Sequence, residues 1–311
     1  MSATLIEPAI SDDERRRRLY AGDLMFYTPR ASTQAFIQHA WQLICEAFDP
    51  IDPEKAQFEV PVEKFVEIIA PLKTRFTHHP KSKELLSAIL EDFGCDIEAT
   101  YFDVPKLRIV STGGYLTSGV GYAYKLHRDI WYACPPSQIN WWVPIRDISE
   151  RCAMSMHPKF FDVPVKNNSG DFDAYRWNAE GRKSAAQYIT SDPRPHPHLQ
   201  EQVDLDREVL VGRPGSVLMF SAQHLHGTIP NDSGRTRFSI DFRTVHRAEI
   251  EAHTGATLVD NGSTGTTLRD FLCAKGYERF PESVVETYEV GSSKHDGVLV
   301  FDPTTLGHQT R

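Results

Sequence analysis

Three segments in the first hundred residues carry apolar side chains every three to four positions, which is the spacing of an amphipathic helix. The first segment runs over 33–48, with Ser32 or Thr33 available as its N-cap. The second carries apolar positions from Val62 to Leu72. The third carries them from 85 to 93, and Gly94 follows as a C-cap. This pattern predicts that residues 1–104 form a mainly helical N-terminal region.

The pattern changes after about Pro105 to short runs rich in Val, Ile, Tyr, Trp and Phe, separated by Gly, Pro, Asn and Ser. Runs of this kind are typical of strands and turns. The predicted strands cover 106–111, 121–131, 138–145, 215–220 and 236–245. Several such strands following a helical region favour a mostly β fold, a sandwich or barrel, with flanking α-helices.

A polar, Pro-rich stretch at about 156–213 is too long for a hairpin connection. Long loops on barrels often cover the active site, so we expect an insert that partly forms a lid. A C-terminal extension follows over 248–311, with a possible helix over 267–275. The whole chain, 1–311, is expected to be one catalytic domain with its core at 105–247.

Composition narrows the class of function. The chain is 40% hydrophobic and 24% charged, as in ordinary globular proteins, and its formal net charge of −8 disfavours nucleic acid or an anionic membrane as a partner. Five scattered cysteines without a CxxC pair indicate free thiols, and no apolar run approaches the length of a bilayer span. We therefore expect a cytoplasmic protein, a monomer or homodimer, that acts on a small molecule.

His127 and Asp129 stand two residues apart in the predicted strand 121–131, so both side chains point to one face. Lys125 and Trp131 share that face. Two histidines and one carboxylate form the facial triad that binds Fe(II) in non-haem oxygenases. A distant second histidine would complete it.

Candidates for that histidine follow the predicted strand 215–220. His224 and His226 share one face, and either can be the third ligand, although the Gly that follows and the spacing to Arg237 favour His226. Arg237 opens a strand in which polar and apolar residues alternate strictly. Its guanidinium can hold a carboxylate in a bidentate pair, with the Ser239 hydroxyl as a further donor.

The residues His127-Arg128-Asp129, His226-Gly227, Asn231 and Arg237-Phe238-Ser239 give the chain a resemblance to the Fe(II)/2-oxoglutarate-dependent oxygenases, within them to the phytanoyl-CoA-hydroxylase-like branch. The resemblance covers roughly 105–245. It implies a double-stranded β-helix, or jelly roll, with flanking helices.

The resemblance also implies roles. His127, Asp129 and His226 would bind Fe(II), and Arg237 and Ser239 would hold the far carboxylate of 2-oxoglutarate, which is converted to succinate and CO₂ while O₂ oxidises the substrate. Hydroxylation of an unactivated C–H bond of a small polar metabolite, in specialised metabolism, is the expected outcome. Halogenation is disfavoured, because halogenating relatives replace the carboxylate ligand with a small residue.

Further pocket residues are expected from alternation and proximity. In the strand 138–145, Gln138 and Asn140 would bond the cosubstrate carboxylates or, equally well, form a structural network in the sheet. The histidines His157, His196 and His198 are expected to be solvent-exposed. The candidates for substrate contact are Tyr115, Lys125, Trp131, Trp142, His224 and Arg243.

Two other classes of protein share part of this pattern. A cupin-like metal-dependent isomerase or a 2-oxoglutarate-independent dioxygenase would have the barrel and the histidines but no need for Arg237-Phe238-Ser239. A noncatalytic small-ligand-binding protein would be expected to lose a ligand or the carboxylate anchor, and this chain retains both.

Overall fold

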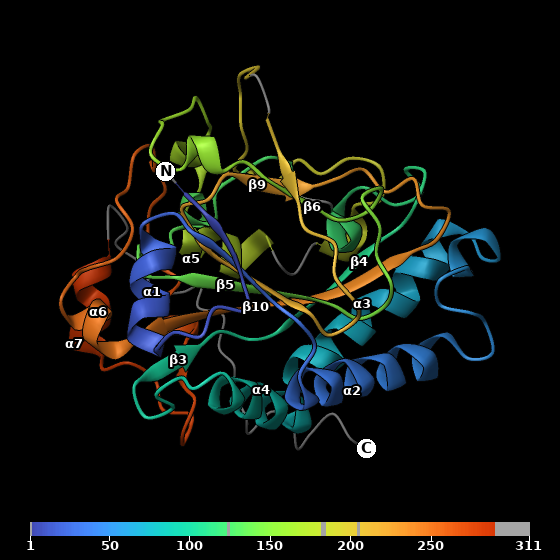
Figure 1. Cartoon of the computed structure of the whole chain (residues 1–311). Coiled ribbons are helices and arrows are strands. Elements are labelled where there is room, and N and C mark those ends of the chain that lie inside the picture. The colour runs from blue at the N-terminus through green and yellow to red at the C-terminus, as the bar shows by residue number, and fades with distance from the viewer. Residues whose placement is uncertain (1, 123–124, 182–184, 204–205, 290–311) are drawn as a thin grey trace.

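Two β-sheets and a layer of helices make up the computed structural model, which describes residues 2–122, 125–181, 185–203 and 206–289 (Figure 1). The large sheet has the strand order β1-β2-β8-β5-β10-β3-β11, with β4 also paired to β10, and the small sheet has the order β7-β6-β9. β1 and β2 are parallel, and every other pairing is antiparallel. This arrangement confirms the predicted mostly β fold with flanking helices, and it fits a jelly roll.

The strands are β1 (Thr4–Ile6), β2 (Leu24–Tyr27), β3 (Thr100–Phe102), β4 (Lys106–Val110), β5 (Ile139–Pro144), β6 (Met154–Met156), β7 (Glu208–Val209), β8 (Val217–Ser221), β9 (His226–Thr228), β10 (Arg237–His246) and β11 (Leu272–Cys273). The helices are α1 (Asp12–Tyr20), α2 (Ala31–Phe48), α3 (Val62–His78), α4 (Pro80–Asp92), α5 (Ala174–Arg176), α6 (Arg247–Glu251) and α7 (Glu282–Val285). None of the described helices is long and apolar enough to cross a membrane.

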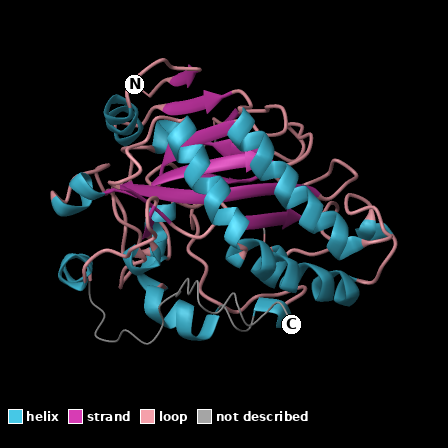
Figure 2. Cartoon of the chain, turned by 90° about the horizontal axis from the view of Figure 1, so that it is seen from below, coloured by secondary structure: helices cyan, strands magenta, loops and turns pink. Residues whose placement is uncertain are grey.

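Strand β10 separates the core from the cavity by its alternation. Phe238, Ile240 and Phe242 are fully buried and pack against the helical layer, where Phe238 meets Trp41 of α2 with ring centroids 5.8 Å apart. Burying each of these side chains contributes roughly 1.5–3 kcal/mol. Figure 2 shows α2, α3 and α4 lying across this face of the sheet. The polar residues of β10 consequently face the other side, toward the small sheet.

The three long helices lie where the sequence predicts them, although one cap differs. Helix α2 begins at Ala31 with Arg30 as its N-cap, and Thr33 at the third helical position accepts from and donates to the Arg30 backbone. The predicted cap at Ser32 or Thr33 is therefore wrong by two or three residues. Gly94 follows α4 with a positive φ of 69°, as a closing glycine requires.

The predicted strand 121–131 is wrong. Its described part contains the single turn η2 (Gly119–Gly121), one isolated bridge at His127 and the 3₁₀ helix η3 (Asp129–Tyr132), whereas Ala123 lies outside the described residues. The helix expected over 267–275 is also wrong, because a 3₁₀ turn at Leu268–Asp270 and β11 occupy most of that range. Strands β1, β2, β3 and β11 extend the large sheet beyond the expected core of 105–247.

Candidate metal centre

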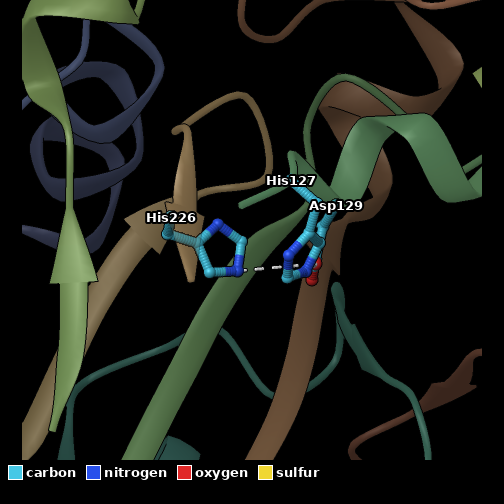
Figure 3. A group of neighbouring side chains, drawn as sticks. All are labelled: His127, Asp129 and His226. Atoms are coloured by element: carbon cyan, nitrogen blue, oxygen red, sulfur yellow. Dashed lines mark ion pairs between the residues drawn. The ribbon is translucent and has the colours of Figure 1, made fainter. Parts of the chain in front are cut away.

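His127, Asp129 and His226 converge between the two sheets. His127 Nε2 lies 3.2 Å from Asp129 Oδ1, and His226 Nε2 lies 3.7 Å from the same oxygen. One ligand atom from each residue lies within 4.8 Å of the others, and all three residues are buried. Figure 3 shows His127 and Asp129 on one segment and His226 on another, with the side chains pointing toward one another. Although the predicted strand is absent, the structure brings the expected triad together.

Backbone pairing fixes the two histidines. The amide of His127 donates to the His226 carbonyl and the amide of His226 donates to the His127 carbonyl, both at 2.9 Å. Asp129 follows in the first position of η3, whose tight turn places its carboxylate beside the two rings. A short antiparallel bridge followed by a turn therefore places His127 and Asp129 together, as the predicted strand was expected to do.

The ring orientations direct Nε2 of both histidines toward the candidate metal position. Each Nδ1 donates to a carbonyl, that of Lys125 at 2.7 Å for His127 and that of His224 at 2.9 Å for His226. In the neutral tautomer that such a bond selects, Nε2 carries a lone pair. Burial lowers the pKa of His226 to about 3, so its ring is neutral. Three electron-pair donors therefore face one another, which is the donor set of a divalent cation.

The carboxylate of Asp129 is ionised, and its two oxygens contact different partners. Burial raises its pKa, yet its interactions with His127, His226 and Arg108 together outweigh burial and leave the pKa lowered. Oδ1 faces the two rings, whereas Oδ2 accepts from Arg243, whose Nε and Nη2 lie 3.4 and 3.5 Å away. One oxygen is thus directed to the metal position and the other is held by a cation.

His224 does not compete for the metal position. It is fully buried, and its Nε2 and Nδ1 lie 3.0 Å from the Gly22 carbonyl and 3.2 Å from the Ser221 carbonyl. Orientation thus groups His226, and not His224, with His127 and Asp129.

Arg128, between the two upstream ligands, points away from the cavity and is fully buried. Its guanidinium donates to Asp260 at 3.1 Å and to the carbonyls of Gln223, Phe160 and Val163. Asp260 also accepts the indole N–H of Trp131 at 2.8 Å. This anchor joins the metal loop to the insert and to the C-terminal segment, and its long-range partners explain why residues 127–132 do not form a strand.

A cavity of about 420 Å³ opens beside the triad, between β4, β5 and β10 of the large sheet and β6 and β9 of the small one. Arg237, Gln138, Asn140, Trp142 and Arg243 line it, as the sequence predicts. Burial lowers the pKa of Arg237 to about 10, so its guanidinium stays charged at neutral pH.

Two cavity-lining residues carry buried polar atoms with no hydrogen-bond partner among the described residues: Arg237 Nε and Asn140 Nδ2. Ser239 Oγ is also buried without a partner, but Ser239 is not one of the residues that line the cavity. Gln138 donates to Asn140 at 3.0 Å, which turns the Asn140 amino group outward from that pair. A buried donor without a partner costs about 1–3 kcal/mol, and a carboxylate supplies the missing acceptors. These residues fit an anionic ligand next to the metal position.

Four of the expected substrate residues lie elsewhere. Tyr115 donates its hydroxyl to Val60 at 2.7 Å and packs on Phe65, Lys125 is exposed, and Trp131 is a core residue. His224 is the fourth, as described above. None of these four residues lines the cavity, so the predicted substrate contacts are wrong. For Lys125 and Trp131, the prediction assumed the alternation of a strand over 121–131, which the structure does not have.

The insert supplies cavity residues that the sequence did not reveal. Phe172, Trp177 and His196 line the cavity, and His196 is 7% exposed, contrary to the expected solvent exposure. His157 is 1% exposed, and His198 is half-buried.

Lys73 of α3 and Thr228 of β9 also line the cavity. Both carried a detectable signal: Lys73 falls four positions after buried Ile69, and Thr228 stands two after His226.

No family model matches this chain, and no curated protein matches it. Among solved structures, EvdO2 from Micromonospora carbonacea var. aurantiaca is 11% identical and covers 77% of this chain and 93% of its own, with a TM-score of 0.44. The non-haem α-ketoglutarate-dependent epimerase SnoN of nogalamycin biosynthesis is 16% identical, covering 81% and 95%, with a TM-score of 0.39. The non-haem α-ketoglutarate-dependent carbocyclase SnoK of the same biosynthesis is 13% identical, covering 76% and 85%, with a TM-score of 0.38. TM-scores below 0.5 decide neither fold nor function, so both rest on the residues of this chain.

Proposed function

We propose that this protein is a non-haem Fe(II)/2-oxoglutarate-dependent oxygenase that oxidises a small molecule. The observation that carries the proposal is the convergence of His127, Asp129 and His226 in one buried site, with Arg237 in the same cavity. Two imidazoles and one carboxylate would hold a ferrous ion and leave it open to further ligands. Iron bound there with 2-oxoglutarate would supply O₂ activation coupled to the release of succinate and CO₂.

The protein side chains would bind and orient the cosubstrate. Arg237 offers Nε to a carboxylate, while its Nη1 donates to the Cys152 carbonyl at 2.8 Å and its guanidinium lies 5.7 Å from the centre of the Trp142 ring. Asn140 and Ser239 add donors from the inner faces of β5 and β10. These contacts support a cosubstrate anchored by its far carboxylate, and burial of the site excludes bulk water.

The proposal also includes the branch of the family, the reaction outcome and the metabolic role. Membership of the phytanoyl-CoA-hydroxylase-like branch, hydroxylation as the outcome, and a role in specialised metabolism follow from the resemblance of the sequence. A cupin-like isomerase, a 2-oxoglutarate-independent dioxygenase or a noncatalytic binding protein has no requirement for a buried Arg237 whose Nε lacks a partner in the same cavity as the triad. The carboxylate anchor therefore separates the oxygenase from these alternatives.

An anaerobic titration with Fe(II) and 2-oxoglutarate, followed by visible absorption, tests the proposal. The wild-type protein should develop a weak charge-transfer band of the chelated cosubstrate. Asp129→Ala should abolish the band. Arg237→Ala should retain Fe(II) but weaken 2-oxoglutarate binding by about 10- to 100-fold, because it removes a charged hydrogen-bonding partner. Absence of the band in folded, iron-loaded protein would overturn the oxygenase assignment.

Matched controls come from the exposed ion pair of Arg151 with Asp232, at 2.8 Å. Asp232→Ala and Arg151→Ala remove the same residue types outside the cavity and should leave the band unchanged. His224→Ala and His226→Ala decide the third ligand in the same assay. Only His226→Ala should lower Fe(II) affinity in a protein that remains folded.

A further inference from the structure

The cavity of about 420 Å³ is lined by more cations than carboxylates. The cations are Lys73, Lys106, Arg108, Arg194, Arg237 and Arg243, and the carboxylates are Asp103, Asp129, Asp241 and Asp270. Fe(II) and 2-oxoglutarate carry equal and opposite charges, so binding both does not change this excess. An anionic substrate would reduce it.

Most of these cations already have a carboxylate partner. Arg108 and Asp241 form a two-bond pair, Lys106 and Arg243 both contact Asp103, and Arg194 pairs with Asp192 of the insert. Arg237 is the proposed anchor of the cosubstrate. Among the described residues, the carboxylate pairs and the proposed cosubstrate together account for every cavity cation except Lys73.

Lys73 is held by a neutral group. Its Nζ donates to the carbonyl of Val120, and the described residues place no carboxylate within ion-pair distance of it. Burial lowers the pKa of Lys73 to about 7, with repulsion from Arg108 acting in the same direction and the more distant carboxylate of Asp241 opposing it in part. A bound anion would restore the charged form and provide the missing counter-ion.

An aromatic wall begins beside the metal position and reaches the loop that holds Lys73. It consists of Tyr132, Phe172, Trp177, His196 and Tyr122, all of which line the cavity. Tyr132 meets the His127 ring edge-on, with centroids 5.7 Å apart. The successive distances from Tyr132 to Phe172, Trp177, His196 and Tyr122 are 5.1, 5.7, 4.8 and 4.0 Å.

The two features meet at the same turn. Val120, which accepts from Lys73, belongs to η2, and Tyr122 directly follows this turn. Aromatic rings favour stacked or edge-on contact with another ring, which contributes about 0.5–1.5 kcal/mol beyond the area buried. A cavity of this size lies within the range of about 300–1,000 Å³ that small-molecule sites occupy.

We propose that the substrate is a planar aromatic monoanion whose ring lies on the aromatic wall and whose anionic group pairs with Lys73. The inference rests on the proposed function, since it assumes that Arg237 and the metal position are taken by 2-oxoglutarate and Fe(II). It names the substrate class and the two contacts that select it.

Calorimetric titration with 2-naphthoate, in the anaerobic protein loaded with Fe(II) and 2-oxoglutarate, tests the class. The matched probes are 2-naphthylmethanol, which keeps the ring without the charge, and decahydro-2-naphthoate, which keeps the charge without the flat ring. We expect 2-naphthoate to bind at least about tenfold more tightly than either, since each comparison removes about 1.4 kcal/mol of interaction. Equal affinity for all three, or no binding of 2-naphthoate, would overturn the proposal.

Variants assign the two contacts. Lys73→Met should weaken 2-naphthoate binding about tenfold and leave 2-naphthylmethanol unchanged, and Lys73→Arg should restore most of the loss. Lys64→Met is the control, because Lys64 lies on the same helix with its side chain 58% exposed. A loss that is equal for both probes would contradict the role of charge.

Trp177→Ala should weaken both aromatic probes about three- to tenfold, whereas decahydro-2-naphthoate should change less. Phe58→Ala removes an aromatic ring that is 62% exposed and serves as its control. Equal losses for the flat and the saturated anion would contradict a stacking role of the wall.

The absorption band of the chelated cosubstrate is followed during the same titrations. Loss of the band on adding 2-naphthoate would mean that the probe occupies the cosubstrate site, which overturns the inference but not the proposed function. Conversely, a protein without the band that still binds 2-naphthoate through Lys73 and Trp177 would retain the inference and reject the oxygenase.

Discussion

The two oxygens of Asp129 face different partners. Oδ1 lies beside the histidine nitrogens, while Oδ2 lies 3.4 Å from Arg243 Nε. Arg243 is held in turn by Asp103, which accepts its backbone amide at 2.8 Å and its Nη1 at 3.2 Å. A guanidinium fixed in this way would leave only Oδ1 of the carboxylate available to a metal ion.

Arg243→Met should therefore lower Fe(II) affinity by about 10- to 100-fold, as expected when the group that orients a ligand is lost. Arg243→Lys should lose less, because it keeps the charge but not the planar fork. Anaerobic Fe(II) titration against a competing chelator measures the change, with Arg151→Met as the control. Unchanged affinity in folded Arg243→Met would show that Asp129 needs no such support.

At the scale of elements, α2 and α4 meet around a buried histidine, His39, which packs against half-buried His79 at the start of α4. His39 of α2 is 5% exposed, its Nε2 lies 3.1 Å from Ser82 Oγ of α4, and its ring packs edge-on against His79 at 4.6 Å. Burial lowers the pKa of His39 to about 4, and the neighbouring charges of His79 and Lys81 add to this. The folded protein thus holds a neutral ring that the unfolded chain would protonate near pH 6.5.

Because the pKa is lower in the folded state, this stabilisation is complete above pH 6.5 and is lost as the pH falls from 6.5 toward 4. Between pH 7.5 and pH 5, the wild-type protein should lose about 1–2 kcal/mol more of its free energy of unfolding than His39→Gln does. Urea denaturation at the two pH values measures the difference, with exposed His253→Gln as the control. Parallel losses in wild type and His39→Gln would contradict this account.

Elements with a long, regular pattern could be predicted from the sequence. Helices α2, α3 and α4 and strands β4, β5, β8 and β10 were predictable because each buries one continuous face. Strands β6 and β9 have three residues each, too few for alternation to appear. The strand predicted over 121–131 is absent from the described residues for a different reason. The conformation around Arg128 depends on Asp260 and on backbone carbonyls that are distant in sequence.

Some residues of the candidate site could be predicted from the sequence, and others could not. His127, Asp129, His226 and Arg237 were predictable from residue type and spacing, which survive a change from strand to turn. The substrate-facing side of the cavity was not, because residues such as Trp177 enter from an insert whose pattern carries no periodic signal.

At the scale of the whole molecule, the insert closes against the turn η2 by direct backbone contact. A Cβ added to Gly119 would lie 2.1 Å from the Ala185 carbonyl oxygen and 2.3 Å from that of Tyr188. Only a residue without a side chain allows this approach. The glycine thus joins the insert to the turn that α3 contacts through Lys73.

Gly119→Ala should loosen this closure and cost about 1–3 kcal/mol of unfolding free energy through the clash. Gly114→Ala is a matched control, since Gly114 also has a positive φ, 75° against 58°, and nothing lies within 4 Å of its added Cβ. Limited proteolysis should cut 156–213 faster in Gly119→Ala than in Gly114→Ala. Similar cleavage and similar stability in the two variants would exclude a closing role for this contact.

The buried Arg128–Asp260 pair has a thermodynamic consequence. Because Arg128 stands between two expected metal ligands, any ordering of the loop by a metal also orders the partner carboxylate, which lies 3.1 Å from Arg128. Linkage is reciprocal, so a metal that orders the loop must slow amide exchange around Asp260. Loss of the Asp260 carboxylate must in turn weaken metal binding by the same coupling free energy. Amide exchange in the C-terminal segment would therefore report from a distance whether the proposed metal site is filled.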